Sequence, residues 1–172
     1  IGAPQQAPRP LPLFLQMLRE ETATSPERRA AALQGLSAYQ TAKRGRKRRA
    51  MPEIARAGRA SLRDYGRGRG GTPVVFVPSL INPPEILDLR GVSMLRWFSR
   101  HDGIRPMLVD WGHPVAGVDT QDVTGHVEQL LVPLIEALDE PPILIGYCLG
   151  GTIAAAAAAL TKVRALGLIA AP

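Results

Sequence analysis

The single cysteine of the chain, Cys148, lies in a stretch whose residue types suit a nucleophile: ILIGYCLGGT, residues 143–152. Gly146 and Gly150 flank it two positions away on either side, the pattern of a sharp strand-to-helix turn that presents a nucleophile. Glycine fits both positions because side chains there would collide in so tight a turn. The turn would also place the sulfur at a helix N-terminus, whose partial positive charge favours a thiolate. The alternative is a small apolar cysteine that only fills the turn.

The start of the predicted helix would supply an oxyanion site. Its first backbone N–H groups have no partner within the helix, and we expect that of Leu149 to bind an oxyanion.

The three histidines of the chain all precede the cysteine. His101 ends a predicted helix, and His126 lies within another, at a surface position or as a satisfied core residue. His113 follows a predicted strand at the same edge as Cys148, which makes it a candidate pocket residue. Asp110 ends that strand, and we expect it to anchor the following loop.

The elements around these residues alternate between short apolar strands and helices. Short strands are predicted over residues 74–77, 107–109, 143–145 and 165–172, and an edge strand over residues 60–66. Helices are predicted over residues 87–103, 119–140 and 149–160, the second bent at Pro133. This alternation predicts an α/β fold with a mostly parallel sheet. Ligands of such sheets gather at the carboxyl ends of the strands, where Cys148 lies.

The N-terminal part has a different character. Residues 1–10 are rich in proline and glutamine, and amphipathic helices are predicted over residues 11–18 and 24–40, with Ser25 as the cap of the second. A basic run, KRGRKRR at residues 43–49, follows. We therefore divide the chain into a helical and basic N-terminal arm and linker, residues 1–50, and an α/β domain over residues 60–172.

Composition and charge narrow the function classes. Residues 1–72 hold 15 Lys and Arg against 5 Asp and Glu, whereas residues 73–172 hold 6 against 10. The basic run is expected to be a solvated linker, with an anionic partner as the alternative. It contains no aromatic residue, which disfavours a stacking platform for nucleic acid.

One cysteine excludes an internal disulfide framework and favours the cytoplasm. No transmembrane segment is visible. No metal-ligand spacing and no glycine-rich phosphate loop is visible either, and these two absences lead us to expect no metal and no bound nucleotide cofactor.

Four segments resemble the polyhydroxyalkanoate synthases and their small α/β-hydrolase relatives. They are VVFVPSLINPPEILDL at 74–89, MLRWFSRHDG at 94–103, MLVDWGHP at 107–114 and the cysteine turn at 143–152, and the resemblance covers about residues 72–172. It implies an α/β-hydrolase fold in which a cysteine takes a hydroxyacyl group from a CoA thioester. The acyl unit then passes to a growing polyester or to water.

The resemblance also assigns roles to individual residues. Cys148 matches the family nucleophile, and the loop at 78–82 matches the segment with a second oxyanion donor. Synthases often carry proline where this chain has Ser79, so the shared donor is the backbone N–H of Leu80. Trp111 matches a family tryptophan that we interpret as a packing residue. The candidate pocket residues are Ser79, Asn82, Trp111 and His113.

The chain departs from the family after the nucleophile. The family order is nucleophile, acid, histidine, and the 24 residues after Cys148 contain neither the family's acid nor its histidine. We therefore expect an N-terminal part of an enzyme, with a fold incomplete in its later strands, that neither folds stably nor turns over substrate by itself.

Three functions remain open. The first is an acyltransferase acting on acyl-CoA, cytoplasmic or associated with a polyester granule surface, with a homodimer as one possible state. The second is a cysteine hydrolase of the dienelactone hydrolase, esterase or thioesterase kind. The third is a non-catalytic protein whose basic arm binds a granule surface, a lipid or another protein.

Overall fold

The computed structural model describes residues 11–42, 48–66, 68, 70–80, 82–115 and 117–172. The chain divides into two compact units, Ile1–Lys47 and Arg48–Pro172. The predicted arm at residues 1–10 and residues 43–47 of the basic run lie outside the described residues.

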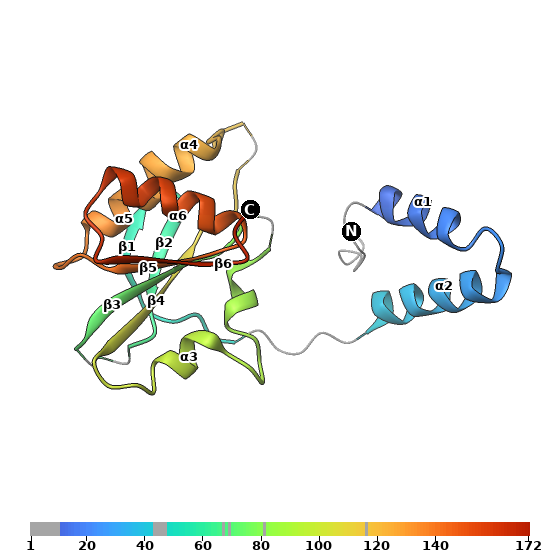
Figure 1. Cartoon of the computed structure of the whole chain (residues 1–172), viewed down its shortest axis with the longest axis horizontal. Helices are drawn as coiled ribbons and strands as arrows, with labels where there is room; N and C mark the ends of the chain where they lie inside the picture. Colours follow the sequence, from blue (N-terminus) through green and yellow to red (C-terminus); the bar gives the residue numbers. More distant parts are fainter. Residues whose placement is uncertain (1–10, 43–47, 67, 69, 81, 116) are drawn as a thin grey trace. The chain divides into compact units, whose positions relative to one another are not determined.

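The first unit contains two helices, α1 (Leu11–Glu21) and α2 (Pro26–Thr41), shown in blue in Figure 1. The predicted cap of α2 is confirmed: the Ser25 Oγ accepts a hydrogen bond from the Arg28 N–H at 3.3 Å. Between the helices, the Arg29 side chain donates to the Thr22 Oγ1 and backbone carbonyl, both at 3.1 Å. The turn is thus held by polar contacts in addition to the helix cap.

The second unit is a six-stranded sheet of order β1-β2-β4-β3-β5-β6. The strands are β1 (Glu53–Ala57), β2 (Ala60–Asp64), β3 (Thr72–Val77), β4 (Ile104–Asp110), β5 (Ile143–Tyr147) and β6 (Ala165–Ile169). Strands β4, β3, β5 and β6 are parallel, whereas β1 and β2 pair antiparallel at one side. The predicted mostly parallel sheet is confirmed.

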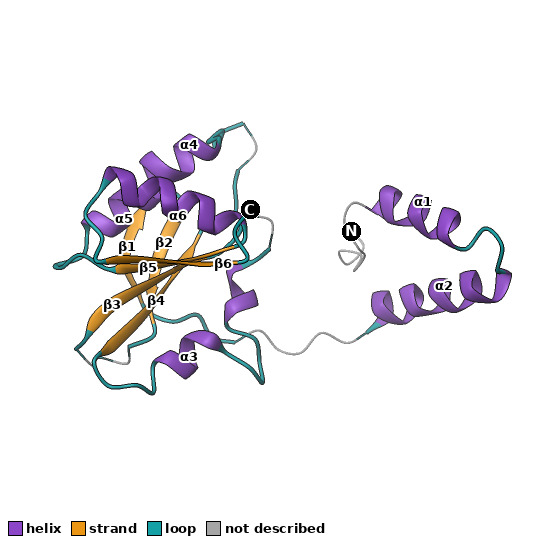
Figure 2. Ribbon diagram, viewed as in Figure 1, coloured by secondary structure: helices purple, strands orange, loops and turns teal. Residues whose placement is uncertain are grey.

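Helices cover both faces of the sheet, as Figure 2 shows. One face carries α4 (Val123–Gly125), η2 (His126–Leu131), α5 (Val132–Glu136) and α6 (Leu149–Leu160), and the other η1 (Pro84–Leu87) and α3 (Met94–Phe98). Strand β3 serves both cores, because Val75 and Val77 pack on the α6 side while Val74 and Phe76 pack on the α3 side. This burial on both faces explains its uninterrupted apolar sequence.

Four elements differ from the sequence prediction. Strand β2 was predicted to be an edge strand but lies between β1 and β4. Strand β1 was not predicted, since its five residues EIARA lack an apolar run and it pairs only with β2 at the edge. The helix predicted over residues 87–103 is much shorter, because Ser93 caps α3 and the helix ends near Ser99. The helix predicted over residues 119–140 is confirmed in place but contains the π-helical turn η2 directly before Pro133. Proline has no N–H to donate to the preceding turn, which suits an irregular helix there.

Candidate active site around Cys148

Cys148 stands between the end of β5 and the start of α6, as the sequence predicted. Its backbone has φ +53° and ψ −132°, a conformation that non-glycine residues rarely adopt. The strained turn is held on both sides: the Cys148 N–H donates to the Ile169 carbonyl at 2.9 Å, and the Cys148 carbonyl accepts from the Gly151 N–H at 2.7 Å. The side chain is half-buried, and the thiol is free. Strain of this kind at a partly exposed thiol is typical of a functional position.

The glycines around the cysteine are required by close backbone approaches. A Cβ on Gly146 would collide with the backbone of Gly151 and with the Gly150 carbonyl, so β5 and α6 could not approach each other as they do. A Cβ on Gly150 would collide with the carbonyls of Val77 and Pro78 at the end of β3. The glycine pattern therefore fixes the start of α6 against the loop after β3.

This packing brings the two predicted oxyanion segments to one edge of the sheet. Leu149 is the first residue of α6, so its backbone N–H points out of the helix end. Leu80 follows the Pro78 carbonyl that contacts Gly150, and the Leu80 and Leu149 side chains pack, half-buried, against the same hydrophobic core. Backbone N–H groups at such an edge can stabilise a developing oxyanion beside Sγ.

A buried hydrogen bond fixes the loop after β3 from the other side. The Trp111 indole Nε1–H donates to the Pro78 carbonyl at 3.0 Å, and Trp111 is buried. The sequence analysis interpreted Trp111 as a packing residue, and the structure adds this polar contact to its packing. The Pro78 carbonyl thus lies between Trp111 and Gly150.

Arg59 and His126 continue this network behind Trp111. The Arg59 guanidinium donates to the Trp111 carbonyl at 2.8 Å and to the His126 Nε2 at 2.6 Å, and the His126 Nδ1–H donates to the Asp122 carbonyl at 2.6 Å. An arginine has only donors, so this arrangement requires the neutral imidazole with its proton on Nδ1. His126 is the satisfied core residue that the sequence analysis allowed, and Arg59 was not singled out there because its partners lie more than 50 residues away.

The remaining candidate residues are placed as follows. Ser79 is fully buried, whereas Asn82 and His113 are exposed on loops. His101 lies after α3, with its ring 4.3 Å from that of Trp97. The Asp110 Oδ1 accepts from the Gly112 N–H at 3.1 Å, which confirms the predicted loop anchor. Among the described residues, no hydrogen bond joins Cys148 to a histidine.

No family model matches the sequence. Two curated proteins are similar to it, both poly(3-hydroxyalkanoate) polymerase subunits. That of Haloferax mediterranei is 36% identical over 107 residues, which make up 58% of this chain and 22% of the relative. That of Cupriavidus necator is 30% identical over 97 residues, 54% of this chain and 16% of the relative. The chain thus spans about a fifth of the length of these relatives, and the resemblance to the synthases is confirmed.

Solved structures decide the fold. An alpha/beta hydrolase enzyme from the metagenome of sediments of the Mar Chica lagoon, Morocco, matches with a TM-score of 0.55 and 19% identity, over 70% of this chain and 52% of that one. The fold is that of the α/β-hydrolases. A laboratory-evolved potato epoxide hydrolase agrees, with a TM-score of 0.54 and 19% identity over 71% of this chain and 39% of its own. In this fold, Cys148 lies at the turn between β5 and α6.

The described helices include none long and apolar enough to cross a membrane.

Proposed function

We propose that the protein with this sequence is an acyltransferase of the polyhydroxyalkanoate synthase type, with Cys148 as its nucleophile. The observation that carries the proposal is the backbone of Cys148, held at φ +53° between β5 and α6. The two polymerase relatives support the choice of acyl transfer to a polyester. The substrate would be a hydroxyacyl-CoA, and cytoplasmic location, a polyester granule surface and a homodimer belong to the same proposal.

The proposed reaction has two steps at one sulfur. The Cys148 Sγ, as thiolate, attacks the thioester carbonyl, and the oxyanion that forms accepts hydrogen bonds from the backbone N–H groups of Leu149 and Leu80. Collapse expels CoA as its thiolate and leaves the acyl group on Sγ. The terminal hydroxyl of the growing chain then attacks this acyl carbonyl, gives up its proton and releases the Cys148 sulfur. The base that accepts the hydroxyl proton is not among the described residues to which we assign a role.

The test follows CoA release and polymer formation from 3-hydroxybutyryl-CoA by the natural protein that carries this sequence. We expect both products, and a loss of both by roughly 10⁴-fold or more in Cys148→Ala. CoA release with free acid and no polymer would instead support the cysteine hydrolase. Activity that survives in Cys148→Ala would contradict both enzymatic functions.

The non-catalytic alternative makes a different prediction. It requires that neither the wild type nor Cys148→Ala releases CoA. It also requires that deletion of residues 43–49 abolishes a salt-sensitive binding to granules or lipid.

A further inference from the structure

A second candidate binding site lies along α3 and the turn before it. The structure has a groove there of about 510 Å³, within the size range of small-ligand sites. Three arginines line it, Arg48, Arg96 and Arg100, and none of the described residues along it is acidic. None of the described residues of the Cys148 turn or of the loop at 78–82 belongs to its lining.

Two of the arginines are fixed in place by a buried carboxylate. Asp88 accepts from the Arg48 Nη1 at 2.7 Å and from the Arg96 Nε at 2.9 Å, and it is buried. One carboxylate balances only one of the two guanidinium charges, and each guanidinium has five N–H donors. An excess of positive charge and several oriented donors therefore remain at the groove, with the exposed Arg100 as a third cation.

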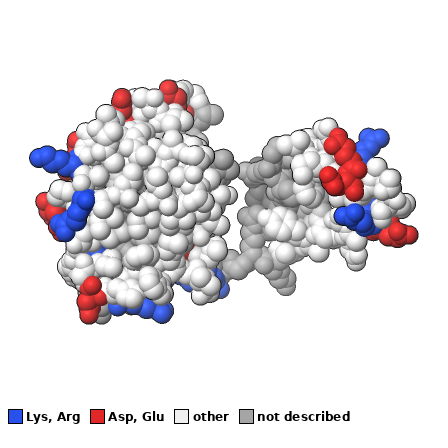
Figure 3. Space-filling view, in the orientation of Figure 1, with Lys and Arg blue, Asp and Glu red and all other residues white. Residues whose placement is uncertain are grey.

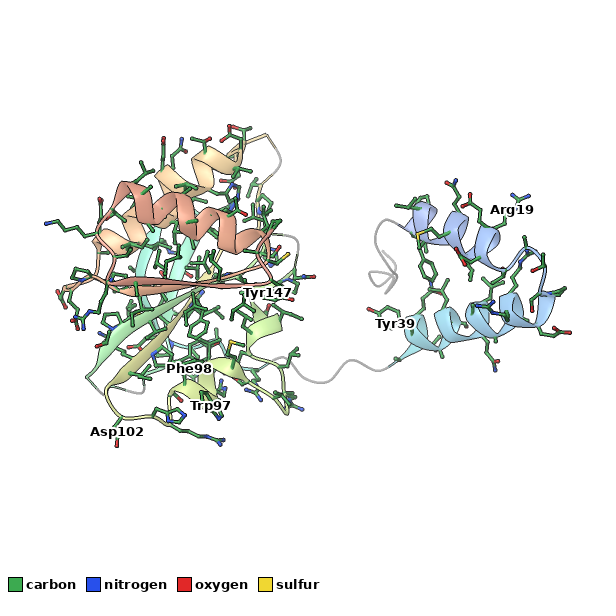
Figure 4. The ribbon with its side chains drawn as sticks, viewed as in Figure 1. Arg19, Tyr39, Trp97, Phe98, Asp102 and Tyr147 are labelled. Atoms are coloured by element: carbon green, nitrogen blue, oxygen red, sulfur yellow. The ribbon has the colours of Figure 1, made fainter. Side chains whose placement is uncertain are left out.

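The groove also has an aromatic wall. Trp97 is 54% exposed, although large aromatic side chains are usually buried. Its ring is held by edge contacts with Phe98, at 5.1 Å between centroids, and with His101, at 4.3 Å. Figure 4 shows Trp97 on α3, and Phe98 packs from the same helix against Phe76 of the sheet. The indole is thus an exposed aromatic surface, in contact with Phe98 and His101, on which a planar ring can stack.

We propose that this groove binds a nucleotide, with phosphate oxygens on the arginines and the base on Trp97. Arginine suits phosphate because its planar donors match two oxygens at once. Stacking on an exposed tryptophan suits an aromatic base. The groove is concave and Asp88 holds two of its three cations, Arg48 and Arg96, in place, which fits a compact anion better than an extended lipid surface. The inference does not rest on the proposed function of Cys148.

The test is a calorimetric titration of the protein with ADP in the wild type and four variants. We expect saturable binding that weakens roughly tenfold in Arg100→Gln, where a charge-assisted bond is lost, and by a similar factor in Trp97→Ala. Arg90→Gln is the matched control, because Arg90 is equally exposed on the preceding turn but does not line the groove. Its affinity should stay within about twofold of the wild type. Cys148→Ala should bind ADP like the wild type, which separates this inference from the proposed function.

Several results would overturn the inference. They are the absence of saturable ADP binding, an equal loss in Arg90→Gln and Arg100→Gln, or an affinity for inorganic phosphate equal to that for ADP. Binding to vesicles of phosphatidylglycerol and phosphatidylcholine without binding to ADP would also overturn it and point to a lipid surface. Both lining variants alter exposed side chains, and thermal melts should show them folded.

Discussion

At the residue scale, the turn around Cys148 requires two positions without a side chain, Gly146 and Gly150. The space that a Cβ would occupy at these two glycines is filled by backbone atoms of neighbouring residues. The sequence predicted that both positions need glycine, and at Gly146 the colliding atoms, those of Gly150 and Gly151, do lie within the turn itself. It could not predict that the Val77 and Pro78 carbonyls are the atoms against Gly150, since that contact joins segments about 70 residues apart.

Gly150→Ala tests this close approach. The added methyl group would meet the Val77 and Pro78 carbonyls, which cannot move without shifting β3, and we expect the free energy of unfolding to fall by about 1–3 kcal/mol. Urea denaturation measures the change. Gly91→Ala is the control, because its Cβ would meet open space and should change stability by no more than about 0.5 kcal/mol. Equal stability of Gly150→Ala and wild type would show that α6 does not lie so close to β3.

Trp111→Phe tests the polar contact to the loop after β3. Phenylalanine keeps most of the packing but leaves the buried Pro78 carbonyl without its donor, which should cost about 1–3 kcal/mol in unfolding free energy. For the proposed acyl transfer by the natural protein, we expect a large decrease in kcat and a small change in KM, because the loop carries the proposed oxyanion donor, the Leu80 N–H. Trp97→Phe should leave both stability and kcat nearly unchanged, as Trp97 is exposed. A loss of stability with an unaltered kcat would mean that Trp111 supports only the core.

At the element scale, strands buried on both faces were predicted well and edge elements were not. The apolar runs of β3, β4 and β5 are visible in the sequence because both sides of each strand need apolar residues. Strand β1 has two charged residues, Glu53 and Arg56, and only one large apolar residue, Ile54. It pairs with β2, and the Glu53 carboxylate also forms an ion pair with Arg63 of β2 at 3.5 Å. Such pairing energy depends on tertiary structure, so no local pattern indicates it.

Asp88 joins several elements, and its titration should affect the stability of the second unit. It accepts hydrogen bonds from Arg48 before β1, from Arg96 in α3 and from the Tyr65 hydroxyl after β2. Burial by itself would raise the pKa of Asp88, but the hydrogen bonds from Arg96 and Ser93 hold it below the ordinary 3.8. Its stabilising contribution is therefore complete above pH 3.8 and is lost as the pH falls through the lower pKa of the folded state.

We expect Asp88→Asn to lower the unfolding free energy at neutral pH by about 1–3 kcal/mol, since it weakens bonds to charged donors. The variant should also lose less stability than the wild type between neutral pH and the acid range. Urea denaturation over a pH series measures both effects. Parallel curves for the two proteins would contradict the assigned role, and Asp102→Asn, at an exposed site, gives the matched comparison.

At the scale of the whole molecule, one side of the sheet carries exposed apolar side chains. Leu168 is 54% exposed on β6, and Leu166 and Ile169 on the same strand are also exposed. Among the described strands, β6 pairs only with β5. The face of the second unit shown in Figure 3 is largely free of charged side chains, which lie toward its rim. An open strand edge with apolar neighbours tends to associate.

The 172-residue chain by itself should therefore associate with increasing concentration. We expect sedimentation velocity to show oligomers that decrease in Leu168→Lys, because the charge opposes pairing at the β6 edge. Leu160→Lys, at an equally exposed leucine near the end of α6, should leave the association unchanged. A chain that is monomeric at every concentration would show that the β6 edge does not promote self-association.

The central claim is that Cys148 carries the acyl group, and an intact-mass measurement tests it most directly. The natural protein would be mixed with a short 3-hydroxyacyl-CoA, quenched in acid and weighed by mass spectrometry, with the adduct then located on the peptide that contains Cys148. The account predicts one acyl increment on that peptide, absent from Cys148→Ala. An unmodified mass, or an adduct that persists in Cys148→Ala, would contradict it and leave the cysteine as a residue that only fills the turn.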